Sequence, residues 1–364
     1  MGETVYQEPL QSPLPQRPAR RAPAWKNQPL WVWAAAAAAA LLVIALLAYF
    51  GRSEPPPPVL GASARSIAVS SSGQLLAVGT FDGMLRLVSP QSGHTLARTQ
   101  LPGPIMAVSF GPEGSVLALV QGQTTLFIFS KDLSTRAERT VQANPRDVVW
   151  SAALGAAVVA GGGETNLSPS LELFPAQPMG IAQSTSQLFD LRDWSAPVDL
   201  VLSEDGSRVA VTLETARRAN VIFYDVAKRS VAASFLVPGK PAGVALAPDS
   251  AYVVSPGDES ITEINAKSFA KIDYPKQAST SPLAMIAVNP GARRAYTTGS
   301  LTFPEVDLEK KIISRTFELP GRSAGIALSP DLATAYLTFK DTNKIGVLDL
   351  QDMKSYREIE LRQP

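Results

Sequence analysis

Two patterns of hydrophobic and polar positions divide the chain. Residues 30–50 are twenty-one consecutive residues without a charge, an amide, a glycine or a proline. As a helix they would measure about 31 Å, enough to cross a hydrocarbon core of about 30 Å. From residue 63 onward, short alternating apolar runs are separated by Gly, Pro, Asp and Asn, which is typical of strands joined by tight turns. The sequence therefore predicts a transmembrane helix over 30–50 followed by an all-β domain.

One sequence motif recurs through the all-β part: an apolar strand, a turn similar to Ser-Pro-Asp-Gly, and a second apolar strand. Clear copies lie at 201–211, 244–254 and 326–336. Aligning all copies on the first strand gives seven apolar anchors: Ile67, Val108, Val149, Leu200, Val244, Ile286 and Ile326. By subtraction the spacings are 41, 41, 51, 44, 42 and 40 residues. A period in the low forties with four strands per unit indicates propeller blades, so we predict a seven-bladed β-propeller over 63–364.

The first and last blades can be outlined strand by strand. In the first blade we expect strands at Ser66–Ser70, Leu75–Thr80, Met84–Ser89 and Thr95–Leu101. The outer strand of the last blade is expected near 355–361, so the ring can close without borrowing a strand; the alternative is that residues 59–64 add to that blade.

The spacing of 51 residues locates an insertion between residues 160 and 197. Elongated loops on a rigid scaffold are often binding elements, and Trp194 in this loop is a contact candidate. A simple surface elaboration is the alternative interpretation.

Charges around the apolar run predict its orientation. The preceding segment carries four basic residues close to the run: Arg17, Arg20, Arg21 and Lys26. The following flank carries Arg52 and Arg65 with Glu54 between them. The positive-inside rule then places the N-terminus in the cytoplasm and the propeller outside it, in the periplasm or extracellular space. A cleaved secretory signal is the alternative, although this run is longer than an ordinary signal core.

The segments beside the predicted span have their own character. Residues 1–29 form a disordered, Pro- and Arg-rich cytoplasmic tail by composition, and residues 51–62 form a Pro-rich linker. Trp31, Trp33 and Tyr49 lie near the ends of the span, where amphipathic rings contact the lipid headgroups.

Composition excludes several kinds of chemistry. The chain has no cysteine and one histidine, His94, which excludes disulfides, thiolate metal sites and multi-histidine metal sites. His94 falls in a predicted turn, so it is unsuited to serve as the base of a Ser-His-Asp triad. A formal net charge of +1 gives no reason to expect nucleic-acid binding. We therefore expect no catalytic residues, no metal and no cofactor.

The closing repeat, residues 329–349, resembles the YVTN-type repeat of bacterial YncE-like propellers, a WD40-like family. Residues 221–226 and 241–248 fit the same pattern, and the resemblance covers about residues 63–361. It departs from WD40 proteins because no blade carries their Gly-His and Trp-Asp pairs. The resemblance implies the propeller fold and says little about function, because propellers include enzymes, ligand binders and scaffolds.

One candidate binding constellation comes from the loops that lead into the inner strands. These loops meet at one mouth of a propeller channel, and five of them carry a basic residue: Arg65, Arg146, Arg192, Lys240 and Arg322. Such a ring would suit an anionic ligand or an acidic loop of a partner. The alternative is that these charges are offset by acidic residues in other loops of that face: Asp82, Glu164, Asp258, Glu259 and Asp341.

From these features we expect a membrane-anchored, extracytoplasmic protein-interaction or scaffold module, an accessory subunit of a membrane or envelope complex. Its partners would be other proteins and, through residues 30–50, the lipid bilayer. The chain is expected not to be an enzyme. The first rival is a small-ligand-binding or sensor propeller, and the second is an enzyme of the lactonase or dehydrogenase kind.

Overall fold

The structure is a computed structural model that describes residues 64–141, 144–162, 170–177, 180–181, 186–190, 196–213, 220–256, 260–275 and 283–361. The chain divides into two compact units, Met1–Pro57 and Pro58–Pro364, and every described residue belongs to the second. The predicted tail, membrane span and linker lie outside these residues, as do Trp31, Trp33 and Tyr49. Within the described ranges no helix is long and apolar enough to cross a membrane.

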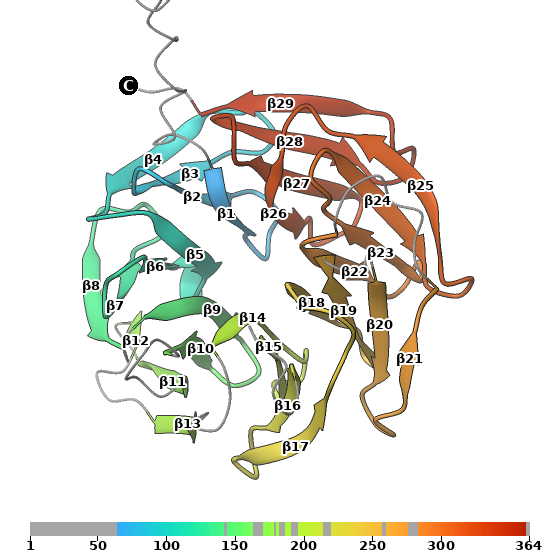
Figure 1. Cartoon of the computed structure of the whole chain (residues 1–364). Helices are drawn as coiled ribbons and strands as arrows, with labels where there is room; N and C mark the ends of the chain where they lie inside the picture. The colour runs from blue at the N-terminus through green and yellow to red at the C-terminus, as the bar shows by residue number, and fades with distance from the viewer. Residues whose placement is uncertain are drawn as a thin grey trace, which may run out of the picture. The chain divides into compact units, whose positions relative to one another are not determined.

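The described strands form seven antiparallel sheets arranged around one axis, so the predicted seven-bladed propeller is confirmed (Figure 1). The first three blades contain β1 Ala64–Val69, β2 Leu76–Thr80, β3 Met84–Val88, β4 Thr95–Gln100; β5 Ile105–Phe110, β6 Val116–Val120, β7 Thr125–Phe129, β8 Arg136–Thr140; and β9 Pro145–Ser151, β10 Ala156–Gly161, β11 Ser170–Gln177, β12 Gly180–Ile181, β13 Ser186–Asp190. The fourth and fifth contain β14 Pro197–Leu202, β15 Arg208–Leu213, β16 Val221–Asp225, β17 Ser230–Phe235; and β18 Gly243–Leu246, β19 Ser250–Ser255, β20 Ser260–Asn265, β21 Lys271–Asp273. The last two contain β22 Ile286–Asn289, β23 Arg294–Thr297, β24 Thr302–Asp307, β25 Ile312–Glu318; and β26 Ser323–Leu328, β27 Thr334–Phe339, β28 Lys344–Asp349, β29 Tyr356–Glu360.

The repeated turn is held by its own side chains. In the fourth blade the Ser203 hydroxyl donates to the Asp205 carboxylate at 2.6 Å and accepts the backbone N–H of Arg208 at 3.0 Å. Gly206 lies in the left-handed region, with φ of 67°, where glycine is favoured. These local bonds compete with continued pairing and so fix where each first strand ends.

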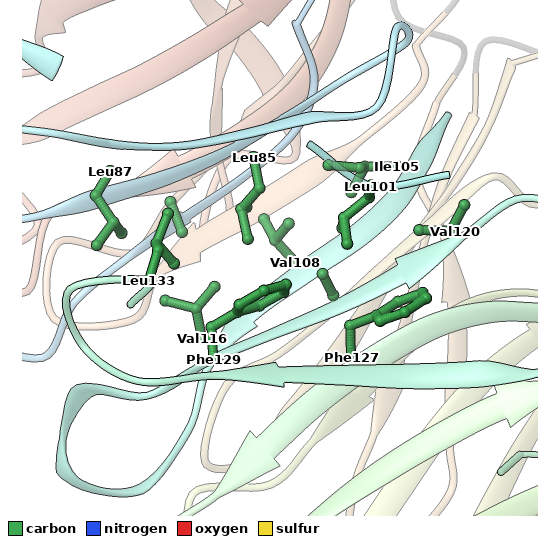
Figure 2. Packing of buried hydrophobic residues seen from close by; sticks show 12 residues of the cluster. Leu85, Leu87, Leu101, Ile105, Val108, Val116, Val120, Phe127, Phe129 and Leu133 are labelled. Carbon is green, nitrogen blue, oxygen red and sulfur yellow. The ribbon is translucent and has the colours of Figure 1, made fainter. Parts of the chain in front are cut away.

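Each pair of neighbouring blades shares one apolar cluster. Because side chains alternate along a strand, β2 directs Leu76 and Val78 toward the seventh blade and Ala77 toward the second. Figure 2 shows the cluster between the first and second blades, where Phe127 and Phe129 pack among leucines and valines from both sheets. A blade buries both of its faces only when it has neighbours on both sides, which is why the ring must close.

Within the described residues, the seventh blade is complete without a strand from the other end of the ring. The seventh blade has the order β26-β27-β28-β29, and Ala64 pairs within the first blade, opposite Thr80. The apolar cluster between these blades and a hydrogen bond from the Arg357 guanidinium to the Pro90 carbonyl join them. The sequence left closure open between a complete seventh blade and one to which residues 59–64 add; Ala64 belongs to the first blade, and residues 59–63 lie outside the described residues. The four strands predicted for the first blade begin and end within two residues of those observed.

The third blade differs from the prediction in two ways. Its inner strand bulges at Arg146, so the residue equivalent to the other anchors is Val148, and Val149 faces the fourth blade instead. The predicted insertion loop contains strands: β12 and β13 both pair with β11. Trp194 lies outside the described residues.

Glycine is required where inner strands approach closely. A Cβ on Gly243 would lie 2.9 Å from the Ala284 carbonyl oxygen and 3.1 Å from the Met285 Cα, both backbone atoms of the next blade. Replacing Gly243 with valine is expected to lower the free energy of unfolding by about 1–3 kcal/mol, because the two blades must separate. Urea denaturation of the full-length protein measures this, with Gly291→Val as the matched control, because Gly291 has no positive φ and an added Cβ would lie 3.6 Å from its nearest atom, the Asn289 side-chain oxygen. Equal losses would show that close approach is not the cause.

Candidate functional site

The seven inner strands β1, β5, β9, β14, β18, β22 and β26 surround the axis of the propeller (Figure 1). Several of them carry a one-residue bulge close to their first residue, as β9 does at Arg146 and β14 does at Val198. The residue after the bulge is Asp147 in β9 and Asp199 in β14. Two successive blades therefore place a carboxylate at the same position, close to the channel mouth where the inner strands begin.

These two carboxylates connect three blades. Asp147 and Asp199 hydrogen-bond to each other. Asp147 also accepts the backbone N–H of Leu200 in the fourth blade at 3.2 Å, and Asp199 accepts that of Val244 in the fifth blade at 2.9 Å. An inner strand has no neighbour on its channel edge, so such N–H groups would otherwise lack a partner in the protein. The acid pair therefore ties consecutive inner strands together.

Burial raises the pKa of both carboxyl groups. Desolvation is the largest cause for Asp147, followed by the negative charge of Asp199, and together they hold its pKa well above the usual range. Desolvation also raises the pKa of Asp199, to about 6. The hydrogen bond from the Val244 N–H lowers this pKa, because it favours the ionised carboxylate, but desolvation is the larger effect. Two carboxyls in contact cannot both ionise cheaply, so the pair keeps one shared proton near neutral pH. Chemically it is an acid beside a carboxylate, able to donate and accept.

The basic residues predicted to ring the channel mouth differ in their surroundings. Arg146 is the bulged residue directly before Asp147, and Lys240 is exposed in the loop that leads into β18. Arg65 is the bulged residue of the β1 backbone, and the Arg65 side chain and Arg192 lie outside the described part of the structure.

Arg322 is not an isolated positive charge. Its guanidinium pairs with Asp341 through two contacts of 2.8 and 2.9 Å, and 60% of its side chain is exposed. The offsetting of basic by acidic loop residues, which the sequence left open, therefore holds at this position. His94 is exposed in the turn after β3, as predicted. Among the described residues no group of three or more His, Cys, Asp or Glu side chains could hold a metal ion.

Grooves open on the opposite face, where the turns between first and second strands lie. A groove of about 520 Å³ runs between the fourth and fifth blades, and a second of about 450 Å³ runs between the fifth and sixth. The two share Ala247, Pro248 and Pro290, so they form one continuous surface across three blades. We call this surface the grooved face. Sequence reasoning did not find it, because its walls come from turns of different blades.

Comparisons with known proteins identify the fold. No protein-family model matches the chain, and no curated protein matches it. Among solved structures, "Kuenenia stuttgartiensis Hydrazine Synthase" superposes with a TM-score of 0.69 at 14% identity, covering 82% of this chain and 97% of that one. "Dihydro-heme d1 dehydrogenase NirN in complex with DHE" superposes with a TM-score of 0.61 at 14% identity, covering 83% and 67%. Identity this low shows a shared fold and nothing further.

The comparison corrects one expectation. The sequence predicted that the chain is not an enzyme, yet the two structures just described are both enzymes by name. That conclusion rested on missing cysteines, histidines and metal clusters, which excludes only the chemistry of those groups. It overlooked the acid pair, whose shared proton is a common element of acid–base sites.

Proposed function

We propose that this propeller is a protein-interaction domain that serves as a subunit of a membrane or envelope complex. The observation that supports it best is the grooved face. Its two grooves are open to solvent and continuous through Ala247, Pro248 and Pro290, a shape that accommodates an extended segment of a partner chain. Loop-built surfaces on a rigid scaffold are where binding functions concentrate.

The proposal includes the setting of the domain. We propose that residues 30–50 anchor it in a membrane with the propeller outside the cytoplasm, supported by the uncharged apolar run and the basic residues before it. We also propose that its repeats belong to the YVTN type, supported by residues 329–349 and the period in the low forties. Neither point is needed for the grooved face to bind a partner.

A second candidate function is small-ligand binding or sensing at the channel mouth. The observation that favours it is the acid pair, which has Arg146 as the neighbour of Asp147. A carboxyl pair that can donate and accept a proton could recognise a small polar molecule. The two candidates use opposite faces of the propeller, so they can be separated experimentally.

Site-specific photo-crosslinking in native membranes tests the proposal. A photoreactive residue is placed at Pro248 on the grooved face, at Lys240 near the channel mouth, or at Leu96, which is 60% exposed on the outer strand of the first blade. We expect one dominant protein adduct from Pro248 and none from Leu96. Adducts only from Lys240 would favour the channel mouth, and the absence of any adduct would contradict the interaction function.

A further inference from the structure

The groove between the fifth and sixth blades contains a carboxylate held by hydroxyl groups. Glu263 of β20 lies opposite Tyr252 of β19 in the sheet, and both line the groove of about 450 Å³. One carboxylate oxygen accepts the Ser250 hydroxyl at 2.9 Å and the Tyr252 hydroxyl at a longer 3.5 Å; the other accepts the Tyr274 hydroxyl at 2.9 Å. We call this the Glu263 groove.

The tyrosines keep the carboxylate oriented without neutralising it. Burial raises the pKa of Tyr274, and its hydrogen bond to Glu263 raises it further. Burial and the negative charge of Glu263 likewise raise the pKa of Tyr252. Both side chains therefore stay neutral donors at physiological pH. Neutral donors fix the position of a carboxylate and leave its charge in place.

The other charges of the groove are already paired with each other. At one rim Lys267 contacts Asp249 at 2.8 Å, and at the other rim Arg293 contacts Glu309 at 3.5 Å. All four of these side chains are at least 70% exposed. Within the described ranges Glu263 has no ion pair, although the Lys311 ammonium lies 5.6 Å from the centre of the Tyr274 ring. The groove therefore contains one uncompensated negative charge.

We propose that the Glu263 groove binds an arginine or lysine side chain presented by a partner protein. The carboxylate would pair with the cation, and the walls made by Tyr252, Pro248 and Pro290 would cover its apolar stem. Nearby exposed ion pairs are weak competitors, because a surface pair gains little free energy. This inference rests on the proposed interaction function, since it names the chemistry of the partner.

A matched pair of peptides tests the charge requirement directly. The full-length protein is titrated with the peptide Gly-Ser-Arg-Ser-Gly and with the same peptide carrying citrulline, which keeps the shape of arginine and removes its charge. Ligand-observed NMR measures both affinities. We expect the arginine peptide to bind at least about tenfold more tightly, as for a hydrogen bond to a charged group. Equal affinities would overturn the inference. A lysine peptide then shows whether the groove prefers a guanidinium or an ammonium.

Two substitutions locate the site. Glu263→Gln removes the charge and keeps one oxygen, which can still accept the Ser250 hydroxyl. Its amide N–H then faces the Tyr274 hydroxyl, which can accept that N–H and donate to the Leu308 carbonyl at 3.3 Å, so the fold and thermal midpoint should be retained. We expect it to abolish the preference for arginine over citrulline. Asp249→Asn is the control, because that rim carboxylate is already paired with Lys267. An unchanged preference in Glu263→Gln, or an equal loss in both variants, would overturn the inference.

The outcome can be separated from that of the proposed function. If Pro248 captures a partner whose recovery is unaffected by Glu263→Gln, the interaction function stands and the basic contact is wrong. If no partner is captured but the peptide still requires Glu263, the cation site stands and the interaction function fails.

Discussion

Replacing Phe127 with alanine is expected to lower the free energy of unfolding by about 3–5 kcal/mol, the usual cost of emptying a buried aromatic site. Phe127 is 2% exposed and belongs to the apolar cluster between the first and second blades (Figure 2). The Arg136 guanidinium lies 4.5 Å from the centre of its ring, so the substitution also removes a cation–π contact. The rigid strands on both sides limit how far the cavity can collapse. Urea denaturation of the full-length protein measures the loss.

Two controls accompany this experiment. Phe127→Leu retains most of the buried volume and should cost clearly less than Phe127→Ala. Leu96→Ala removes a side chain that is 60% exposed, and the free energy of unfolding should stay within about 0.5 kcal/mol of the parent value. If Phe127→Ala costs no more than Leu96→Ala, the blade interface does not limit stability.

The architecture can be predicted from the sequence because residues within each repeat determine where its strands begin and end. Turns such as Ser203–Gly206 end strands through side-chain bonds that depend on neighbouring residues only. The alternating pattern then assigns each strand residue to one of two neighbouring blades. The reasoning fails where alternation is ambiguous: Val148 and Val149 are both apolar, so the pattern could not show the bulge at Arg146 that decides which of them is the anchor.

The candidate sites were harder to predict because they depend on distances around the ring. Asp147 and Asp199 are 52 residues apart, and each alone resembles an ordinary polar residue in a strand. One signal was present at Asp199, which directly precedes the predicted anchor Leu200; Asp147 takes the same position only because the bulge makes Val148 the anchor of the third blade. The Glu263 groove was harder to predict from the sequence, because Tyr274, which donates to Glu263, lies after the end of the outer strand β21.

The acid pair should make the protein more stable at mildly acidic pH. A raised pKa means that the folded state binds a proton more tightly than the unfolded chain, whose aspartates titrate near pH 4. The stabilisation is therefore complete below about pH 4 and is lost as pH rises through the folded pKa of Asp199, about 6. From that shift we expect the contribution of Asp199 to the free energy of unfolding to fall by about 2–3 kcal/mol between pH 4 and 7. The raised pKa of Asp147 extends the decline to higher pH. Because the chain has a single histidine, few other groups titrate between pH 5 and 7.

Substitutions at Asp199 separate its charge from its hydrogen bonds. Asp199→Asn keeps an oxygen for the Val244 N–H and offers an amide N–H to Asp147, so it should flatten the pH profile and make the protein more stable than the parent at pH 8. Asp199→Ala leaves the Val244 N–H without its acceptor and should cost about 1–3 kcal/mol at pH 5. Asp205→Asn is the matched control, because hydrogen bonds from Ser203 and Ser207 lower the pKa of that carboxyl to about 2. The Asp205 carboxylate therefore loses its contribution to the free energy of unfolding as pH falls below 4, and its substitution should not change the slope of the stability profile between pH 5 and 7. Urea titrations at pH 4, 5, 6, 7 and 8 measure all four proteins. A parent profile that is flat between pH 5 and 7, or one that Asp199→Asn leaves unchanged, would show that the two carboxyls do not share a proton.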